Sequence, residues 1–158
     1  MEVRKLKRVL IENSGFTVIQ LLGALALMTV MIAIGVPQYV ALQPGMRLNG
    51  AAREVLGKLM WARSKAVEEN NQWVVTFPTN HTFQLLDDTN NNGVADAGES
   101  TTTVDISTDY SGVTLSKSGP DPTFSTRGTA GGSTTITITN TSGSRTVTVN
   151  AAGNVKVS

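Results

Sequence analysis

The chain has no cysteine and a single histidine, His81, among its 158 residues. Without cysteine no disulfide can form, and catalysis by a thiolate is excluded. One histidine without a convergent acid–base cluster disfavours an enzyme, so we predict a structural role. Net charge is also low, only +1 at neutral pH, which provides no general electrostatic attraction to nucleic acid.

Charged residues are absent from a run of 21 residues that extends from Phe16 to Val36. A helix needs about 20 mainly apolar residues to cross a bilayer, so this run can span a membrane. The preceding leader, residues 1–15, is basic and carries a net charge of +2, which leaves −1 for the rest of the chain. Basic residues beside a membrane helix predict that the N-terminus lies in the cytoplasm.

A small residue, Gly15, stands directly before the apolar run. Secretory signal peptides place their small-residue cleavage site after the apolar run, which is the opposite order. Cleavage between Gly15 and Phe16 would remove the basic leader and keep the helix on the mature protein. The alternative is an ordinary signal anchor that is never cleaved.

The segment Gly15-Phe16-Thr17-Val18-Ile19-Gln20-Leu21 resembles the class III leader of type IV pilins and type II secretion pseudopilins. The resemblance implies that a prepilin peptidase cleaves before Phe16 and then N-methylates that residue. It also implies a bacterial inner-membrane protein that assembles with other pilins or pseudopilins through its N-terminal helix. Pro37 falls where many pilins have a helix-bending proline, and a proline inside a helix removes a backbone donor.

Gln20 departs from the family pattern, which has glutamate at this position in most members. The resemblance implies that this glutamate pairs with the N-terminal amine of a neighbouring subunit. Glutamine forms hydrogen bonds but carries no charge, so we expect a weaker assembly contact. Gln20 therefore favours a minor subunit, present in few copies. The alternative is that the substitution leaves assembly unchanged.

The sequence predicts one long helix from Phe16 to about Asn70, in two parts. The part after Pro37 is amphipathic, and Pro44-Gly45 marks a second weak point. Its apolar residues recur in steps of four and three, which is helical spacing. This stripe consists of Leu48, Ala52, Val55, Leu59, Ala62 and Ala66.

Beyond Asn70-Asn71 the chain becomes rich in threonine, valine, serine and glycine, with short alternating runs. Such runs between turn residues predict antiparallel strands. The expected strands cover 73–77, 83–86, 102–106, 112–115, 123–126, 134–139, 146–150 and 155–157. The expected organisation is a leader (1–15), a transmembrane helix (16–36), an amphipathic continuation (37–71) and a periplasmic β domain (72–158). The fold class is α+β.

This layout resembles the pilin fold, and among pilins the GspH/FimT group. The residues that carry the second resemblance lie in three places: Arg53 to Leu56 with Trp61 to Ala66, Asp88 to Glu99, and Phe124 to Gly128 with the β-rich tail that ends near Gly153. The absence of a cysteine pair also favours a minor subunit or pseudopilin, because many major pilins close a C-terminal loop with a disulfide.

The loop from Asp88 to Glu99 matches the spacing of a twelve-residue calcium-binding loop. Oxygen ligands at this spacing suit a hard cation, and Gly93 occupies the sharp turn. The flanks differ from an EF-hand because a strand precedes the loop, and turn chemistry alone explains many Asn, Asp and Gly residues. Structural calcium is thus one interpretation, and a plain turn is the other. The candidate ligands are Asp88, Asn90, Asn92, Val94 through its carbonyl, Asp96 and Glu99.

Some FimT-like proteins bind DNA through basic residues near the C-terminus. The matching region here keeps Lys156, with Arg145 on a nearby predicted strand. Dispersed charges of this kind provide only weak, salt-sensitive attraction, so DNA binding is not favoured. Three functional hypotheses follow: a minor pseudopilin of a type II secretion system, a minor type IV pilin that primes pilus assembly, and a DNA-uptake receptor.

Overall fold

A computed structural model describes residues 16–158, and the chain divides into two compact units. The first unit ends at Tyr39 and the second extends from Val40 to Ser158. The helix α1 (Val18–Glu68) contributes residues to both units. Its bounds lie within two residues of the predicted ones. The predicted leader, including Gly15, lies outside the described residues.

Within the first unit, the described residues form the N-terminal part of α1, whose large apolar side chains are exposed. The helix is long and apolar enough to cross a membrane by length and composition. Residues on both sides of Pro37 are helical, and the same holds at Pro44. A bend at Pro37 stays a prediction. Pro44 does not interrupt the helix, and its carbonyl accepts a hydrogen bond (2.7 Å) from the side-chain amide of Asn140.

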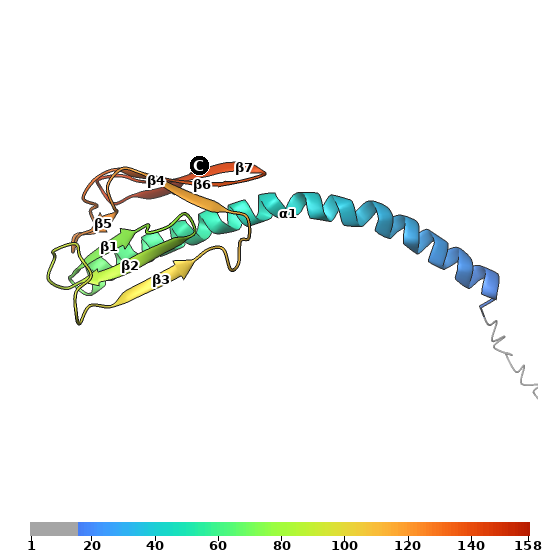
Figure 1. The fold of residues 1–158 in the computed structure, drawn as a ribbon, viewed down its shortest axis with the longest axis horizontal. Coiled ribbons are helices and arrows are strands. Elements are labelled where there is room, and N and C mark those ends of the chain that lie inside the picture. Colours follow the sequence, from blue (N-terminus) through green and yellow to red (C-terminus); the bar gives the residue numbers. More distant parts are fainter. Residues whose placement is uncertain (1–15) are drawn as a thin grey trace, which may run out of the picture. The chain divides into compact units, whose positions relative to one another are not determined.

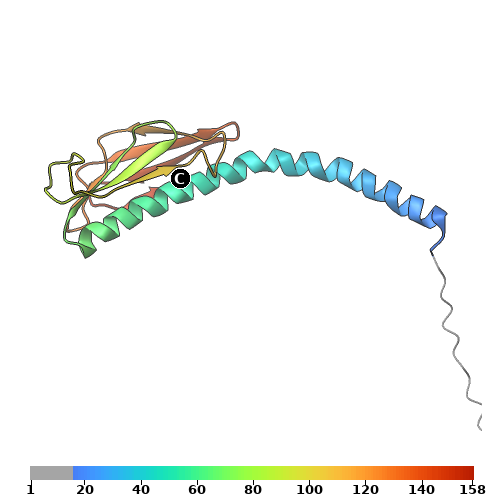
Figure 2. The ribbon, with the colours of Figure 1, turned by 60° about the horizontal axis from the view of Figure 1, so that its bottom comes forward.

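The second unit places two four-stranded antiparallel sheets beside the C-terminal part of α1 (Figures 1 and 2). One sheet has the order β3-β2-β1-β5 and the other the order β4-β6-β7-β8. This arrangement confirms the predicted α+β fold. The strands are β1 (Gln72–Thr76), β2 (Thr82–Asp88), β3 (Thr101–Asp105), β4 (Thr114–Ser118), β5 (Thr123–Phe124), β6 (Thr134–Asn140), β7 (Gly143–Val149) and β8 (Val155–Val157).

The core lies between α1 and the two sheets. The whole predicted stripe of α1, from Leu48 to Ala66, is buried, and Ala51 joins it. Several stripe positions are alanines, and small side chains let the strands approach the helix closely. In β6, Ile136 and Ile138 are buried while Thr135 and Thr137 are half-buried, as strand alternation predicts.

Most predicted strands differ from the observed ones by up to three residues at an end, and the strand expected over 112–115 is β4, at Thr114–Ser118. Two of these differences have a clear local reason. The strand expected over 123–126 ends at Phe124, because the Ser125 N–H donates to the Thr129 carbonyl (2.9 Å) and closes a turn. The hairpin between β6 and β7 is tighter than expected, since Asn140 already pairs with Gly143. The Asn140 side chain accepts the Ser142 N–H (2.8 Å), which stabilises this short turn.

Candidate functional site

Thr17 and Gln20 form a reciprocal pair at the start of α1. The Thr17 N–H donates to Gln20 Oε1 (2.9 Å), and the Gln20 N–H donates to Thr17 Oγ1 (3.3 Å). This is a capping box, which satisfies two of the backbone donors that every helix leaves free at its N-terminus. The neighbouring Phe16 is exposed. Gln20 thus has a local partner within its own chain, and its role in filament assembly stays a prediction.

In the predicted calcium loop, carboxylates of the loop accept hydrogen bonds from backbone N–H groups of the same loop. The Asp88 side chain is buried and accepts the Asn92 N–H (3.0 Å) and the Gly93 N–H (2.7 Å). Gly93 has a positive φ of 78°, which glycine adopts without strain. At the other end, Glu99 Oε1 accepts the Thr89 N–H (3.0 Å). The last bond brings Glu99 to the residue that directly follows Asp88, so the two ends of the loop lie close together.

The middle of this loop contains the remaining predicted ligands. Asp96 accepts side-chain amide bonds from Asn90 (2.8 Å) and Asn92 (2.6 Å), and the same bonds lower the pKa of Asp96. The Val94 N–H donates to the Asn92 side chain (2.7 Å). No group of three or more His, Cys, Asp or Glu side chains in residues 16–158 is arranged to hold a metal ion. A cation here would therefore depend on amide and carbonyl oxygens beside the carboxylates.

Arg145 and Lys156, the candidate DNA contacts, lie on opposite faces of one sheet. Arg145 belongs to the face of β7 that contains the buried Val147 and Val149, and its guanidinium donates to Asn49 of α1 (3.0 Å). Lys156 pairs with Thr148, whose side chain is on the outer face. The structure therefore does not bring these two cations together.

Two glycine turns meet at the C-terminal end of α1. In the first turn the Gly128 N–H donates to the Ser125 carbonyl (2.8 Å), and in the second the Gly153 N–H donates to the Asn150 carbonyl (2.8 Å). Both glycines have positive φ, 74° and 78° respectively. A Cβ atom at Gly153 would overlap the Gly128 carbonyl oxygen. The two turns can therefore approach only because Gly153 has no side chain.

Arg63 of α1 joins these two turns to the helix. Its Nε donates to the Gly128 carbonyl oxygen (2.8 Å), and the side chain is partly buried. A Cβ atom at Gly128 would lie 3.2 Å from Arg63 Nε, so the glycine also makes room for the guanidinium. Residues that carried the GspH/FimT resemblance thus converge here: Arg63, Gly128 and Gly153.

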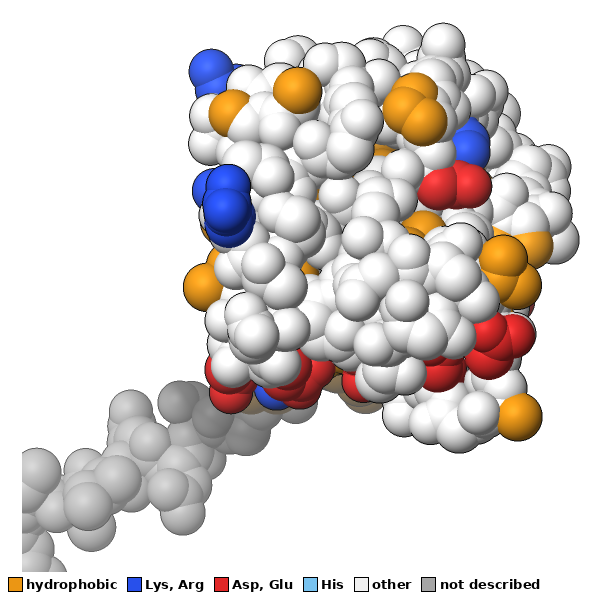
Figure 3. Space-filling view, turned by 90° about the vertical axis from the view of Figure 1, so that its left-hand side faces the viewer, with side chains coloured by type: hydrophobic (Ala, Val, Ile, Leu, Met, Phe, Trp, Pro, Cys, Tyr) orange, Lys and Arg blue, Asp and Glu red, His pale blue; other side chains and the backbone are white. Residues whose placement is uncertain are grey.

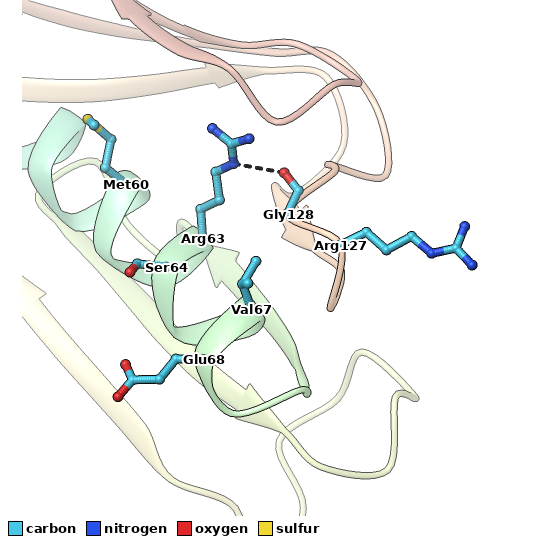
Figure 4. A pocket seen from close by; sticks show the side chains of 7 residues that line it. All are labelled: Met60, Arg63, Ser64, Val67, Glu68, Arg127 and Gly128. Atoms are coloured by element: carbon cyan, nitrogen blue, oxygen red, sulfur yellow. Dashed lines mark hydrogen bonds between the residues drawn. The ribbon is translucent and has the colours of Figure 1, made fainter.

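An open cleft of about 530 Å³ lies beside this junction (Figure 4). Met60 and Val67 supply its apolar surface, and both are exposed. Figure 3 views the end of the second unit where α1 terminates, with acidic side chains along its lower edge and Lys and Arg side chains mainly on the left. We name the cleft the Arg63 cleft. Its lining consists of Met60, Arg63, Ser64, Val67, Glu68, Arg127 and Gly128.

One long helix against two antiparallel sheets, with an exposed apolar N-terminal segment, defines a pilin-like protein. The sequence profile of the family described as "Type II transport protein GspH" matches residues 51–153, so the chain belongs to the GspH family. Members of this family are structural components, not enzymes, and they assemble with other pilins or pseudopilins. No protein with curated annotation matches the sequence.

Solved structures share the fold. The type IV minor pilin FimU of Pseudomonas aeruginosa (strain PAO1) is 19% identical, with a TM-score of 0.56 over 70% of this chain and 87% of that chain. The minor pseudopilin EpsH from the type 2 secretion system of Vibrio cholerae is 14% identical, with a TM-score of 0.55 over 71% of this chain and 96% of that chain. These likenesses show that the pilin fold is correctly predicted.

Two features of the site were not predicted from the sequence. The Thr-x-x-Gln signature of the capping box is present at Thr17 to Gln20 and could have indicated it. The sequence contains a weaker indication of the Arg63 cleft. The sequence marks turns at Gly128 and Gly153, but no local pattern shows that both turns contact the same arginine.

Proposed function

We propose that the chain is a minor pseudopilin of a type II secretion system. The observation that carries this proposal is the match to the GspH family over residues 51–153. The exposed apolar part of α1 supports it, because a pseudopilin needs such a helix both in the membrane and in the filament. The protein acts at or near the tip of a short periplasmic filament that drives protein export.

In this proposal, prepilin peptidase cleaves the Gly15–Phe16 bond and N-methylates Phe16. The mature chain stays in the inner membrane through residues 16–36, and the β domain lies in the periplasm. Inner-membrane lipid surrounds the helix until it packs beside the helices of other pseudopilins. Gln20 caps its own helix and brings no charge to a neighbour's N-terminal amine, which limits repeated addition of this subunit.

The first alternative is a minor type IV pilin that primes pilus assembly, which the fold likeness to FimU supports. The second alternative is a DNA-uptake receptor. It has less support, because Arg145 and Lys156 lie on opposite sheet faces and would contribute separately to phosphate binding.

Deleting the gene is expected to abolish secretion of exported proteins while leaving twitching motility and transformation intact. Loss of twitching alone would favour the minor pilin, and loss of transformation alone would favour the DNA receptor.

The intact mass of the wild-type membrane protein is expected to show removal of residues 1–15 and addition of one methyl group. An unprocessed mass in a host with active prepilin peptidase would contradict the proposal.

We also propose that the loop from Asp88 to Glu99 binds structural calcium. Saturating calcium is expected to raise the melting temperature of the processed protein in detergent by at least about 5 °C relative to chelator. The Glu99→Gln variant removes one carboxylate and should lose this shift. Asp109→Asn, an exposed change outside the loop, should retain it. Equal melting temperatures with calcium and with chelator would exclude the site.

A further inference from the structure

We infer that the Arg63 cleft is the docking site for a carboxylate-bearing segment of a different pilin-like subunit. This inference rests on the proposed function, because it assigns to the cleft a neighbour within the assembled filament. Three properties of the cleft support it: a fixed guanidinium with unused donors, an excess of positive charge, and an exposed apolar surface beside that charge.

The guanidinium of Arg63 is held in place before any partner arrives. Its Nε donates to the Gly128 carbonyl (2.8 Å), and a Cβ atom at Gly153 would lie 3.1 Å from that same nitrogen. A guanidinium has five N–H donors in a planar fork, and within residues 16–158 only the Nε donor of Arg63 makes a hydrogen bond to the protein. The remaining donors suit a carboxylate, which accepts two parallel bonds from such a fork.

Positive charge in the cleft is not neutralised by the described part of the chain. No carboxylate in residues 16–158 lies within ion-pair distance of Arg63 or Arg127. The acidic residue of the lining, Glu68, pairs with Lys65 (3.2 Å), and Figure 4 shows its side chain turned away from Arg63. Arg127 is exposed at the rim, and Figure 4 shows its side chain directed away from Arg63. An exposed cation at the rim can attract an approaching anion.

The apolar part of the lining indicates what kind of anion fits. Met60 is 55% exposed and Val67 is 52% exposed, and both side chains lie beside the fixed guanidinium. A phosphate group of DNA would use the two arginines but leave these apolar surfaces in contact with water. A protein segment with an Asp or Glu next to an aliphatic side chain would satisfy both, because burying apolar area is favourable. The cleft therefore fits an acidic protein segment better than a nucleic acid.

Site-specific photocrosslinking in the secreting bacterium tests the inference on the full-length chain. A photoreactive phenylalanine derivative is placed at Ser64, which is exposed within the cleft, and separately at Thr148, which is exposed on the outer sheet face. The Ser64 probe is expected to form an adduct with another pilin-like subunit, through a peptide that contains Asp or Glu beside an aliphatic residue. The Thr148 probe should not form this adduct.

Charge reversal provides the decisive comparison. Arg127→Glu, at an exposed rim position, is expected to reduce the Ser64 adduct about tenfold, and Lys156→Glu should leave it unchanged. Arg63→Lys keeps the charge but loses the planar fork, and should also reduce the adduct. Reversing the partner's carboxylate to Lys should restore the adduct with Arg127→Glu.

The inference would be overturned by the absence of an adduct, or by an adduct that survives Arg127→Glu. An adduct that forms only with DNA or only with a second copy of this chain would overturn it as well. In each case a processed wild-type chain that supports secretion would leave the proposed function standing. An unprocessed wild-type chain, or secretion that does not need it, would instead contradict the proposed function and the inference with it.

Discussion

Replacing Gly153 with alanine is expected to lower the free energy of unfolding by about 3 kcal/mol. Two separate costs add up at this position. Gly153 has a φ of 78°, a left-handed conformation that strains residues with a Cβ atom. The new Cβ would also overlap the Gly128 carbonyl oxygen, which is backbone and cannot move aside without opening a turn. Because Arg63 donates to the same carbonyl, the cleft should lose its geometry as well.

Gly112→Ala separates the two costs. Gly112 has nearly the same φ, 80°, but no heavy atom lies within 4 Å of the position of its missing Cβ. This variant should therefore show only the conformational strain, about 1 kcal/mol. Urea unfolding of the processed protein in detergent can be followed by tryptophan fluorescence, since Trp61 and Trp73 pack edge to face at 5.1 Å. Equal destabilisation by the two variants would show that contact with Gly128 contributes nothing.

Much of the fold could be predicted because its signals are local. The stripe from Leu48 to Ala66 repeats at helical spacing, and every position in it is buried against the sheets. The strands likewise follow from alternation within each run and from the turn residues between runs. The loop from Asp88 to Glu99 turns at Gly93, where the Asp88 carboxylate accepts two backbone N–H groups, and calcium binding there stays a prediction.

The Arg63 cleft could not be predicted, because its parts are distant in the sequence. Arg63 and Gly128 are separated by 65 positions, and only the sheet topology brings the turn at Gly128 to the end of α1. Strand register, which the sequence did not reveal, likewise decides whether the two candidate DNA-binding residues lie on the same face of the sheet. Arg145 and Lys156 belong to the adjacent strands β7 and β8, but the pairing of Lys156 with Thr148 places their side chains on opposite faces of the sheet.

Leu59→Ala is expected to lower the free energy of unfolding by about 3 kcal/mol. The Leu59 side chain is fully buried between α1 and the sheets, at the centre of the stripe that attaches the helix to the β domain. Alanine removes this packing but retains high helix propensity, so the loss reports the helix–sheet interface and not the helix itself. The same urea titration of the processed protein measures it.

Met60→Ala is the matched control, because it changes the adjacent position on the same helix from a large apolar residue to alanine. Met60 faces the cleft and is exposed, so its truncation should change the free energy of unfolding by less than about 0.5 kcal/mol. A comparable loss in both variants would mean that the helix contacts the domain on two sides, and that the Arg63 cleft is closed in solution. A large loss in Leu59→Ala alone would leave the exposed face of α1 free to contact a neighbouring subunit.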